Sequence, residues 1–431
     1  MKKIILLFFF ILFFSLLFLP QVLSLPFAKK FLEEEISKRA SLSLSIEKLR
    51  CSWFGPQELS GVWVRQEKIS AHLEKIQIAL PLWSIKEWQE ALSFQGGSLP
   101  DLQLTKIEGS LKGKSVDLSG ESEKGGMFTL SGLFSSSSDF SLNLHCSAFP
   151  SALVDSLLHA KGWFSAFVGP LFAAESHCTA DHIEGSLRSS ALQLAVEGEL
   201  QKKSLHFTKP FQLLLRPTSQ LLELFREHFS LPLLGVDYSI SLRIDSQGSH
   251  IPVSPFSLKE IRLPHSILDL GRFSLDLPLS FPPLVSLPAP LSVWLTPLFF
   301  SMADGKVALE RVDALLGNAF HLCAWGDLNL HSSALHGTLG IPADTLESRL
   351  KISSLSPTYV LQIPVTGTFE HPEIAKSTAA AKIGALLAIQ HGESVAPLFG
   401  KKGAIVGKIL KNAAPPQEPE APSPHRPFPW E

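Results

Sequence analysis

The chain has 431 residues, of which 45% are hydrophobic and 18% are charged, and its formal net charge is −2. The charged share lies below the quarter, roughly, that is usual in soluble domains, which predicts more apolar surface than an ordinary core accounts for. A near-neutral chain has no basic field to hold a phosphate backbone, so we expect no nucleic acid among its partners.

The N-terminal segment indicates export from the cytosol. Residues 4–28 follow two lysines and contain no charged side chain. A run of roughly 20 apolar residues matches the hydrocarbon thickness of a bilayer. As a retained anchor it would leave the lysines in the cytoplasm and the bulk of the chain outside. We predict a transmembrane anchor at residues 1–28; the alternative is a signal peptide cleaved near residues 22–24. Both interpretations export residues 30–431.

After this segment the sequence predicts a short helix and then short strands. Residues 31–39 (FLEEEISKR) indicate a helix. From Leu42 onward the period changes to two, because apolar and polar residues alternate. Residues 53–56 (WFGP) are a turn signal. Residues 69–73 and 76–80 alternate in different phases and are interpreted as two separate strand faces.

Further strands repeat this alternation through the middle of the chain. The clearest apolar sets are Phe140, Leu142, Leu144 and Cys146; Leu192, Leu194 and Val196; and Tyr238, Ile240, Leu242 and Ile244. One apolar and one polar face per strand is typical of an antiparallel sheet covered on one side only. Residues 151–160 and 219–229 have helical spacing instead. Five prolines in residues 277–291 exclude a central strand and indicate an irregular apolar crossing or an edge segment.

The C-terminal end has a different character. Residues 396–412 combine Lys401, Lys402, Lys408 and Lys411 with an apolar side. A basic amphipathic helix of this kind is typical of a membrane surface or partner site. The alternative is a helix that caps the sheet while its lysines remain solvated. The last residues, 413–431, contain seven prolines, which predicts a disordered or polyproline tail.

The sequence carries no motif that indicates catalysis. It has no Gly-x-Ser-x-Gly, no phosphate-binding Gly-Lys-Ser/Thr loop and no His-Glu-x-x-His. His177, Cys178 and His182 match no zinc spacing. We therefore expect no enzyme, no metal and no cofactor.

Four cysteines lie far apart in the sequence: Cys51, Cys146, Cys178 and Cys323. In an oxidising compartment they could pair, with a connectivity that spacing does not reveal. We favour the interpretation that they are small buried thiols.

Both ends of the chain resemble the AsmA-like family of envelope proteins. At the N-terminal end the anchor is followed by AKKFLEEEISKRASLSLSIEKLRCSWFGPQELSGVWV, a helix leading into a strand, a turn and a second strand. At the C-terminal end, LHGTLGIPADTLESRL precedes YVLQIPVTGTFEHPEIAKSTAAAKIG, with a closing Val-Thr-Gly-Thr and a His-Pro. The likeness implies a long, curved, open sheet with an apolar groove. It also implies a role in envelope lipid homeostasis, carriage of phospholipid acyl chains between membranes, and placement in a bacterial inner membrane.

On this interpretation the chain is a single-pass protein whose N-terminus is cytoplasmic and whose bulk is periplasmic. Residues 29–372 form the groove domain and residues 373–412 the C-terminal amphipathic helical segment. The expected partners are membrane lipids and envelope proteins. Residues predicted to line the groove are Leu42, Leu44, Ile46, Phe140, Leu142, Leu144, Leu192, Leu194, Leu242 and Ile244. The alternative is an assembly factor for outer-membrane proteins or secretion, whose apolar face is covered by a protein partner.

Overall fold

The computed structural model describes residues 23–391 and 417–431, apart from 41, 67–68, 82–83, 85–90, 100–103, 124, 137–138, 159, 202, 230–232, 254–256, 277, 282–284, 353–354 and 369–370. The chain forms two compact units, Met1–Ser190 and Ala191–Glu431. The boundary between them falls inside the segment 29–372, which the sequence predicted to be one groove domain. Both units are mainly antiparallel β with a few short helices, as predicted.

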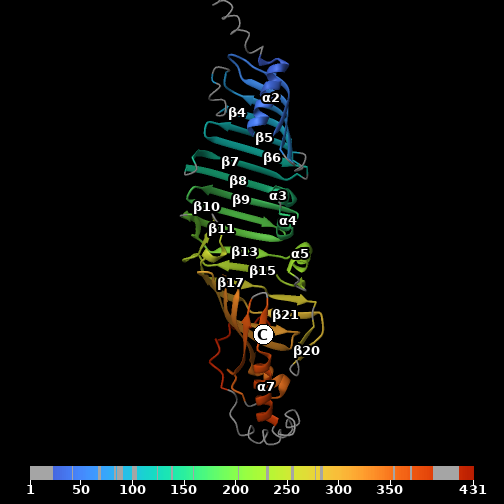
Figure 1. Ribbon diagram of the computed structural model, residues 1–431, viewed down its shortest axis with the longest axis vertical. Helices are drawn as coiled ribbons and strands as arrows, with labels where there is room; N and C mark the ends of the chain where they lie inside the picture. The colour runs from blue at the N-terminus through green and yellow to red at the C-terminus, as the bar shows by residue number, and fades with distance from the viewer. Residues whose placement is uncertain are drawn as a thin grey trace, which may run out of the picture. The chain divides into compact units, whose positions relative to one another are not determined.

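Unit 1 is an antiparallel meander in which each strand pairs with the next along the chain. Its strands, blue to green in Figure 1, are β1 Ser43–Arg50, β2 Gln57–Gln66, β3 Ile69–Ile78, β4 Ala91–Leu99, β5 Leu104–Lys112, β6 Ser115–Ser122, β7 Met127–Ser136, β8 Asp139–Pro150, β9 Leu171–Thr179 and β10 His182–Ser189. Two helices, α3 Ser151–Leu158 and α4 Trp163–Val168, connect β8 to β9.

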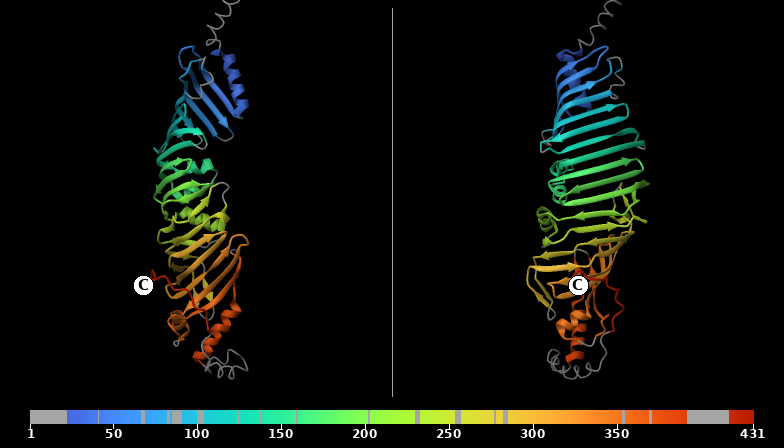
Figure 2. Two further views of the ribbon diagram at one scale, coloured as in Figure 1. Left: turned by 90° about the vertical axis from the view of Figure 1, so that its left-hand side faces the viewer. Right: turned by 180° about the vertical axis from the view of Figure 1, so that it is seen from behind.

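A helix protects the free edge of this sheet at β1. Helix α2, Pro26–Ala40, includes the helix predicted at residues 31–39 and lies along the first strand (Figure 2). The backbone N–H of Ile46 donates to Glu33 Oε1 at 2.7 Å, and that of Leu44 donates to Ser37 Oγ at 3.1 Å. Edge N–H groups that would otherwise remain open to another strand are satisfied in this way.

The two alternation patterns predicted in residues 69–80 occur within one strand, β3. Its apolar side chains shift by one position along the strand, from Ile69, Ala71 and Leu73 to Ile76 and Ile78. The shift is clearest in β1, where Glu47 and Lys48 are both exposed and alternation then resumes. Gly61 and Gly96 lie beside the Glu47 and Glu74 side chains, with φ of 60° and 64°. Glycine adopts this left-handed conformation without a steric penalty, and the pairs β1–β2, β2–β3 and β3–β4 keep the same register on both sides of it.

Unit 2 is a more branched sheet. Its strands are β11 Leu192–Gln201, β12 Ser204–Phe207, β13 Phe211–Leu215, β14 Leu233–Val236, β15 Ile240–Ile244, β16 His250–Pro252, β17 Leu263–Asp269, β18 Arg272–Leu275, β21 Leu291–Leu295, β22 Leu298–Ala303, β23 Lys306–Leu316, β24 Phe320–Asn329, β25 Ala334–Pro342, β26 Val360–Gly367 and β27 Pro372–Ile374. A ladder of antiparallel pairs runs β11–β13–β15–β17–β22–β23–β24–β25–β26–β27. Two further sets of pairs, β14–β18–β21–β23 and β11–β12–β16, branch from it.

The proline-rich segment forms a small hairpin of its own, β19 Leu279–Phe281 with β20 Val285–Leu287, rather than an irregular crossing. The helices predicted at 151–160 and 219–229 are confirmed as α3 and α5, Ser219–Phe229. A short 3₁₀ turn, η3, covers Leu258–Glu260.

The best-packed core lies at the C-terminal end of unit 2. Helices α6, Ala343–Leu350, and α7, Lys376–His391, pack against β24–β26. The cluster contains Phe320, Ile341, Leu346, Ile352, Leu361, Ile363, Ala379, Ile383 and Leu386, each at most 3% exposed. Helix α7 lies within the predicted segment 373–412; Lys401, Lys402, Lys408 and Lys411 lie outside the described residues.

Among the described helices, none combines the length and apolar character that crossing a bilayer requires. Of the anchor predicted at residues 1–28, positions 1–22 lie outside the described residues.

Candidate functional site

The apolar face of unit 1 is built from cross-strand partners on consecutive strands. Leu118 of β6 pairs with Leu130 of β7, which pairs with Leu144 of β8. Directly paired residues point to the same face, so these three leucines form one row. The neighbouring row contains Val116, Gly132 and Leu142 in the same order. Leu142 and Leu144, predicted from β8 alone, therefore belong to an apolar surface shared by several strands.

Glycines on this face make room for aromatic rings. A Cβ on Gly109 would lie 2.6 Å from the ring of Phe94, and one on Gly120 would lie 2.2 Å from the ring of Phe128. The rings therefore lie across the neighbouring strand instead of standing away from the sheet. This arrangement spreads apolar surface evenly over the face, with no polar side chain in these positions.

The opposite face of the same strands is polar. Thr129 of β7 pairs with His145 of β8, and His145 Nδ1 lies 3.4 Å from Glu175 Oε1 on β9. Asn143 Oδ1 lies 2.7 Å from His177 Nδ1. These contacts are exposed, and such surface pairs contribute little to stability. The polar side chains of this face therefore need no covering element. Two apolar residues of β7, Met127 and Leu133, also lie on it and are 50% and 58% exposed, while Ser176 of β9 pairs with Leu144 on the apolar face.

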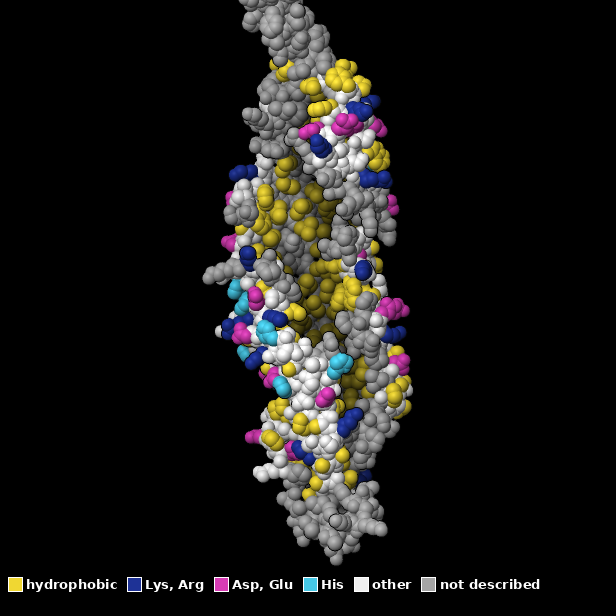
Figure 3. Space-filling view, in the orientation of Figure 1, with side chains coloured by type: hydrophobic (Ala, Val, Ile, Leu, Met, Phe, Trp, Pro, Cys, Tyr) yellow, Lys and Arg dark blue, Asp and Glu magenta, His cyan; other side chains and the backbone are white. Residues whose placement is uncertain are grey.

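The apolar face of unit 1 is hollowed and only partly shielded. Figure 3 shows hydrophobic side chains gathered in a hollow over the middle strands of unit 1, with charged side chains on its rims. Leu118, Leu130 and Leu144 are all partly exposed. The main helix–strand packing in the described chain involves β1, β14, β24, β25 and β26. The described helices thus leave β4–β7 without a broad cover.

In unit 2 a comparable apolar row continues into a packed core. Leu194 pairs with Leu213, Leu213 with Leu242, and Leu242 with Leu268. Beside this row, however, Ile244 is 4% exposed because Phe207 and other residues of the β12–β16 branch pack in the same cluster. The face in unit 2 is therefore partly closed by the protein itself.

The predicted lining residues divide accordingly. Seven are partly exposed: Leu42, Leu44, Phe140, Leu142, Leu144, Leu194 and Leu242. Three are buried: Ile46, Leu192 and Ile244. Leu42 precedes β1, with its N–H donating to the Ser37 carbonyl at the end of α2. The three buried residues contribute to core packing, which alternation alone could not distinguish from an open surface.

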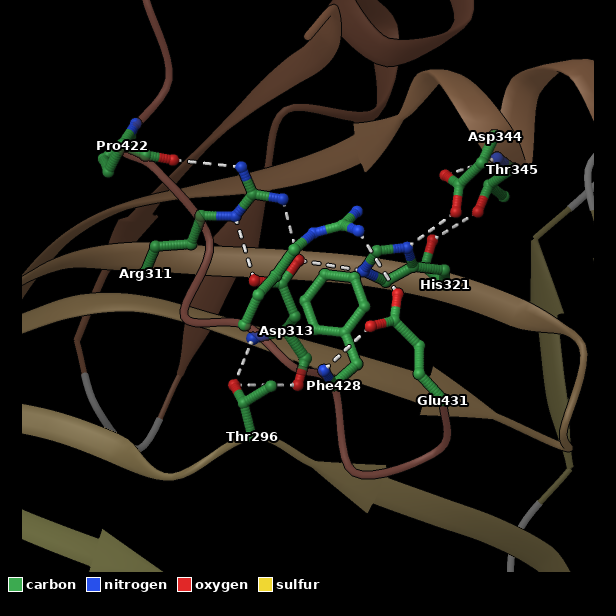
Figure 4. Close-up of polar contacts among 10 residues, drawn as sticks. Thr296, Arg311, Asp313, His321, Asp344, Thr345, Pro422, Phe428 and Glu431 are labelled. Atoms are coloured by element: carbon green, nitrogen blue, oxygen red, sulfur yellow. Dashed lines mark hydrogen bonds and ion pairs between the residues drawn. The ribbon is translucent and has the colours of Figure 1, made fainter. Parts of the chain in front are cut away.

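A second cluster, which sequence reasoning missed, is a buried network of charges in unit 2. Asp313 on β23 is fully buried and accepts two hydrogen bonds from Arg311, at 3.0 and 2.8 Å. His321 Nε2 lies 2.8 Å from Asp313 Oδ1, and His321 Nδ1 lies 3.0 Å from Asp344 Oδ2. Figure 4 shows the histidine held between the two carboxylates. The four residues come from two strands and a helix, and no short motif joins them.

This network docks the C-terminal segment 417–431. Arg311 Nη1 donates to the Pro422 carbonyl at 2.9 Å, and the Phe428 ring packs edge-on against His321 with centroids 5.1 Å apart. Phe428 is 6% exposed. Lys382 of α7 also pairs with Glu418 at 2.8 Å. The sequence predicted a disordered tail at 413–431, whereas residues 417–431 are held by hydrogen bonds, an ion pair and ring packing.

Burial and charge shift the pKa values of this network in opposite directions. Burial alone would raise the pKa of Asp313, but hydrogen bonds from His321 and Arg311 outweigh it and lower that pKa. Burial would lower the pKa of His321, but its bonds to Asp313 and Asp344 raise it. Both shifts favour a protonated His321 between ionised carboxylates, the charge state of an ion-pair network.

We expect the stability of the fold around this network to depend on pH. The contribution of His321 is full below its ordinary pKa of 6.5 and is lost as pH rises through its raised folded value. The contributions of Asp313 and Asp344 are full above their ordinary pKa of 3.8 and are lost as pH falls through their lowered values. The network should therefore stabilise unit 2 most in mildly acid solution, between these two ordinary values.

Hydrogen exchange of the backbone amides of β23 and β24, followed from pH 4 to 9 and compared with the intrinsic exchange rate at each pH, measures this dependence, with protection rising as pH falls from 9 toward 6. His321→Gln should remove the change. His336→Gln, at an exposed position in the same unit, should retain it. A pH profile unaltered by His321→Gln would contradict the assignment.

The four cysteines are free thiols; Cys146 and Cys323 are buried, as favoured from the sequence, whereas Cys51 and Cys178 are only partly buried. Burial raises the pKa of Cys323 to about 12, so this residue next to the charge network is not an activated nucleophile. Within the described residues, no group of histidine, cysteine and acidic side chains has the arrangement of a metal site.

Comparison with known proteins gives no further guide: no family model, no curated protein and no solved structure matches the chain.

Proposed function

We propose that the apolar sheet face binds the acyl chains of phospholipids, and that the protein is a membrane-anchored envelope protein similar in role to the AsmA-like family. In this proposal the sheet is a curved, open groove that carries lipid between membranes and supports the outer membrane. The observation that carries it is the partly exposed apolar row Leu118–Leu130–Leu144, whose neighbours on the opposite face include Thr129, Asn143 and His145.

The ligand class follows from the chemistry of the face. Monomeric proteins rarely leave a continuous apolar surface in water unless something binds there. An acyl chain gains roughly 0.8 kcal/mol for each methylene removed from water. It needs no directional polar partner, and the rows of unit 1 offer leucine, valine, phenylalanine and glycine. The charged rims in Figure 3 suit headgroups that remain in water.

The test is lipid retention by the chain from residue 23 onward, purified without the apolar segment 4–22. We expect mass spectrometry of the purified protein to detect phospholipid, and the protein to extract labelled phospholipid from vesicles. A protein that carries no lipid and takes none up would contradict the proposal. Retention of a protein partner on the same face, without lipid, would favour the assembly-factor alternative.

A further inference from the structure

The turn between β1 and β2 displays an exposed aromatic side chain on a rigid support. Gln57 is 1% exposed, and its Nε2 donates to the carbonyls of Ser52, Gly55 and Leu80 at 2.8, 2.9 and 3.2 Å. Its Oε1 accepts the N–H of Ser52 at 2.8 Å. At the tip of this turn the side chain of Phe54 is 88% exposed. A buried amide that uses four hydrogen bonds thus holds a phenylalanine out into solvent.

The start of α2 lies beside this turn. The backbone N–H of Cys51 donates to Ser24 Oγ at 3.0 Å, which brings the two segments together. Leu25, Phe27 and Phe31 are 46%, 63% and 68% exposed. Phe54 and these three residues are therefore large apolar side chains on adjoining segments at one end of unit 1.

Helix α2 changes character along its exposed stripe. Phe27, Phe31, Glu34 and Lys38 are exposed and are spaced four, three and four residues apart, which places them on one side of a helix. The stripe is apolar in its first half and charged in its second half. Lys30, also exposed, lies next to Phe31. Such a gradient is typical of a helix that leaves a lipid interface, where aromatic rings sit at headgroup level and lysines meet phosphate.

We infer that the segment 24–31 and the turn 51–56 form a bilayer-contacting surface, with Phe54, Phe27 and Phe31 inserted at headgroup level. The occupant is a phospholipid bilayer because the chain immediately before Leu23 is apolar and uncharged from residue 4 to residue 22. A membrane into which residues 4–22 insert must lie next to the surface formed by the segment 24–31 and the turn 51–56. The inference goes beyond the proposed function, since it concerns a contact outside the apolar sheet face.

Site-specific photo-crosslinking of the full chain tests this surface. Benzoylphenylalanine replaces Phe31, Phe54 or, as the control, His336, an exposed polar residue of unit 2. Each protein is reconstituted into phosphatidylethanolamine–phosphatidylglycerol vesicles that contain an alkyne-tagged phospholipid. We expect lipid adducts at positions 31 and 54 to exceed those at 336 several-fold. Equal labelling at the three positions, or protein adducts alone at 31 and 54, would overturn the inference.

Two further variants separate this surface from the sheet face and from misfolding. Leu130→Glu, placed on the sheet face, should leave labelling at positions 31 and 54 unchanged even where it abolishes lipid retention. Gln57→Leu, which removes the four hydrogen bonds of the Gln57 amide to the turn and to Leu80, should lower labelling at 54 more than at 31. If Leu130→Glu abolished labelling at 54 in a folded protein, the adducts would come from lipid on the sheet face and the inference would fail.

Discussion

Replacing Leu130 with glutamate is expected to abolish lipid retention, whereas the same substitution at Thr129 is expected to leave it close to that of the unaltered chain. The two residues are neighbours on β7 and point to opposite faces: Leu130 pairs with Leu118 and Leu144, and Thr129 pairs with His145 and Ser119. The two variants therefore add the same charge and differ only in the face of the sheet on which that charge lies. Phospholipid bound per protein, measured by mass spectrometry, is the readout.

The expected size of the effect follows from the cost of desolvating a carboxylate. A bound acyl chain would exclude water from residue 130, and burying an unpaired charge costs several kcal/mol. Each loss of about 1.4 kcal/mol in binding free energy lowers affinity tenfold, so the affinity for phospholipid should fall by more than about a hundredfold. Equal loss with Thr129→Glu would indicate a general effect of charge on folding, and retention by both variants would exclude this row as the binding surface.

The second large effect is expected at Asp313. Asp313→Ala would leave Arg311 buried without its carboxylate partner and remove one of the two acceptors of His321, and breaking a buried ion pair from one side costs about 3–5 kcal/mol. Asp344→Ala removes the other acceptor, but the Asp344 side chain is 65% exposed, so a cost of about 1 kcal/mol or less is expected.

Hydrogen exchange is the suitable measurement, because a chain with two units need not unfold in one step. Backbone amides of β23 and β24 should exchange much faster in Asp313→Ala, and only slightly faster in Asp344→Ala. The segment 417–431 should lose its protection in the first variant. Equal exchange in the two variants would mean that the buried carboxylate is not the centre of the network.

The local alternation of the sequence predicted much of the fold. Leu142 and Leu144 share a face with Leu130 and Leu118 because strand periodicity survives wherever one face is apolar and the other polar. Helices α3 and α5 were predicted from helical spacing. The phase change in β3 was misinterpreted as two faces because the cause, a row with Gly61 and Gly96 at positive φ, lies on the neighbouring strands.

Features that depend on long-range packing could not be predicted in this way. Ile244 alternates like Leu142, yet it is buried because the β12–β16 branch packs against it. The proline-rich end has a composition typical of disorder, but Phe428 and Pro422 find partners in His321 and Arg311, roughly a hundred residues earlier along the chain. Neither the β12–β16 branch nor the docked segment 417–431 produces a periodic pattern of apolar residues in the sequence.

The most direct test of the central claim is photo-crosslinking at two adjacent residues of β8. Leu142 lies on the apolar face and Asn143 on the polar face, where it contacts His177. With benzoylphenylalanine at each position in the full chain, and tagged phospholipid in the surrounding membranes, the account predicts lipid adducts at position 142 and none above background at position 143. Protein adducts without lipid at position 142, or equal lipid labelling at both positions, would contradict it.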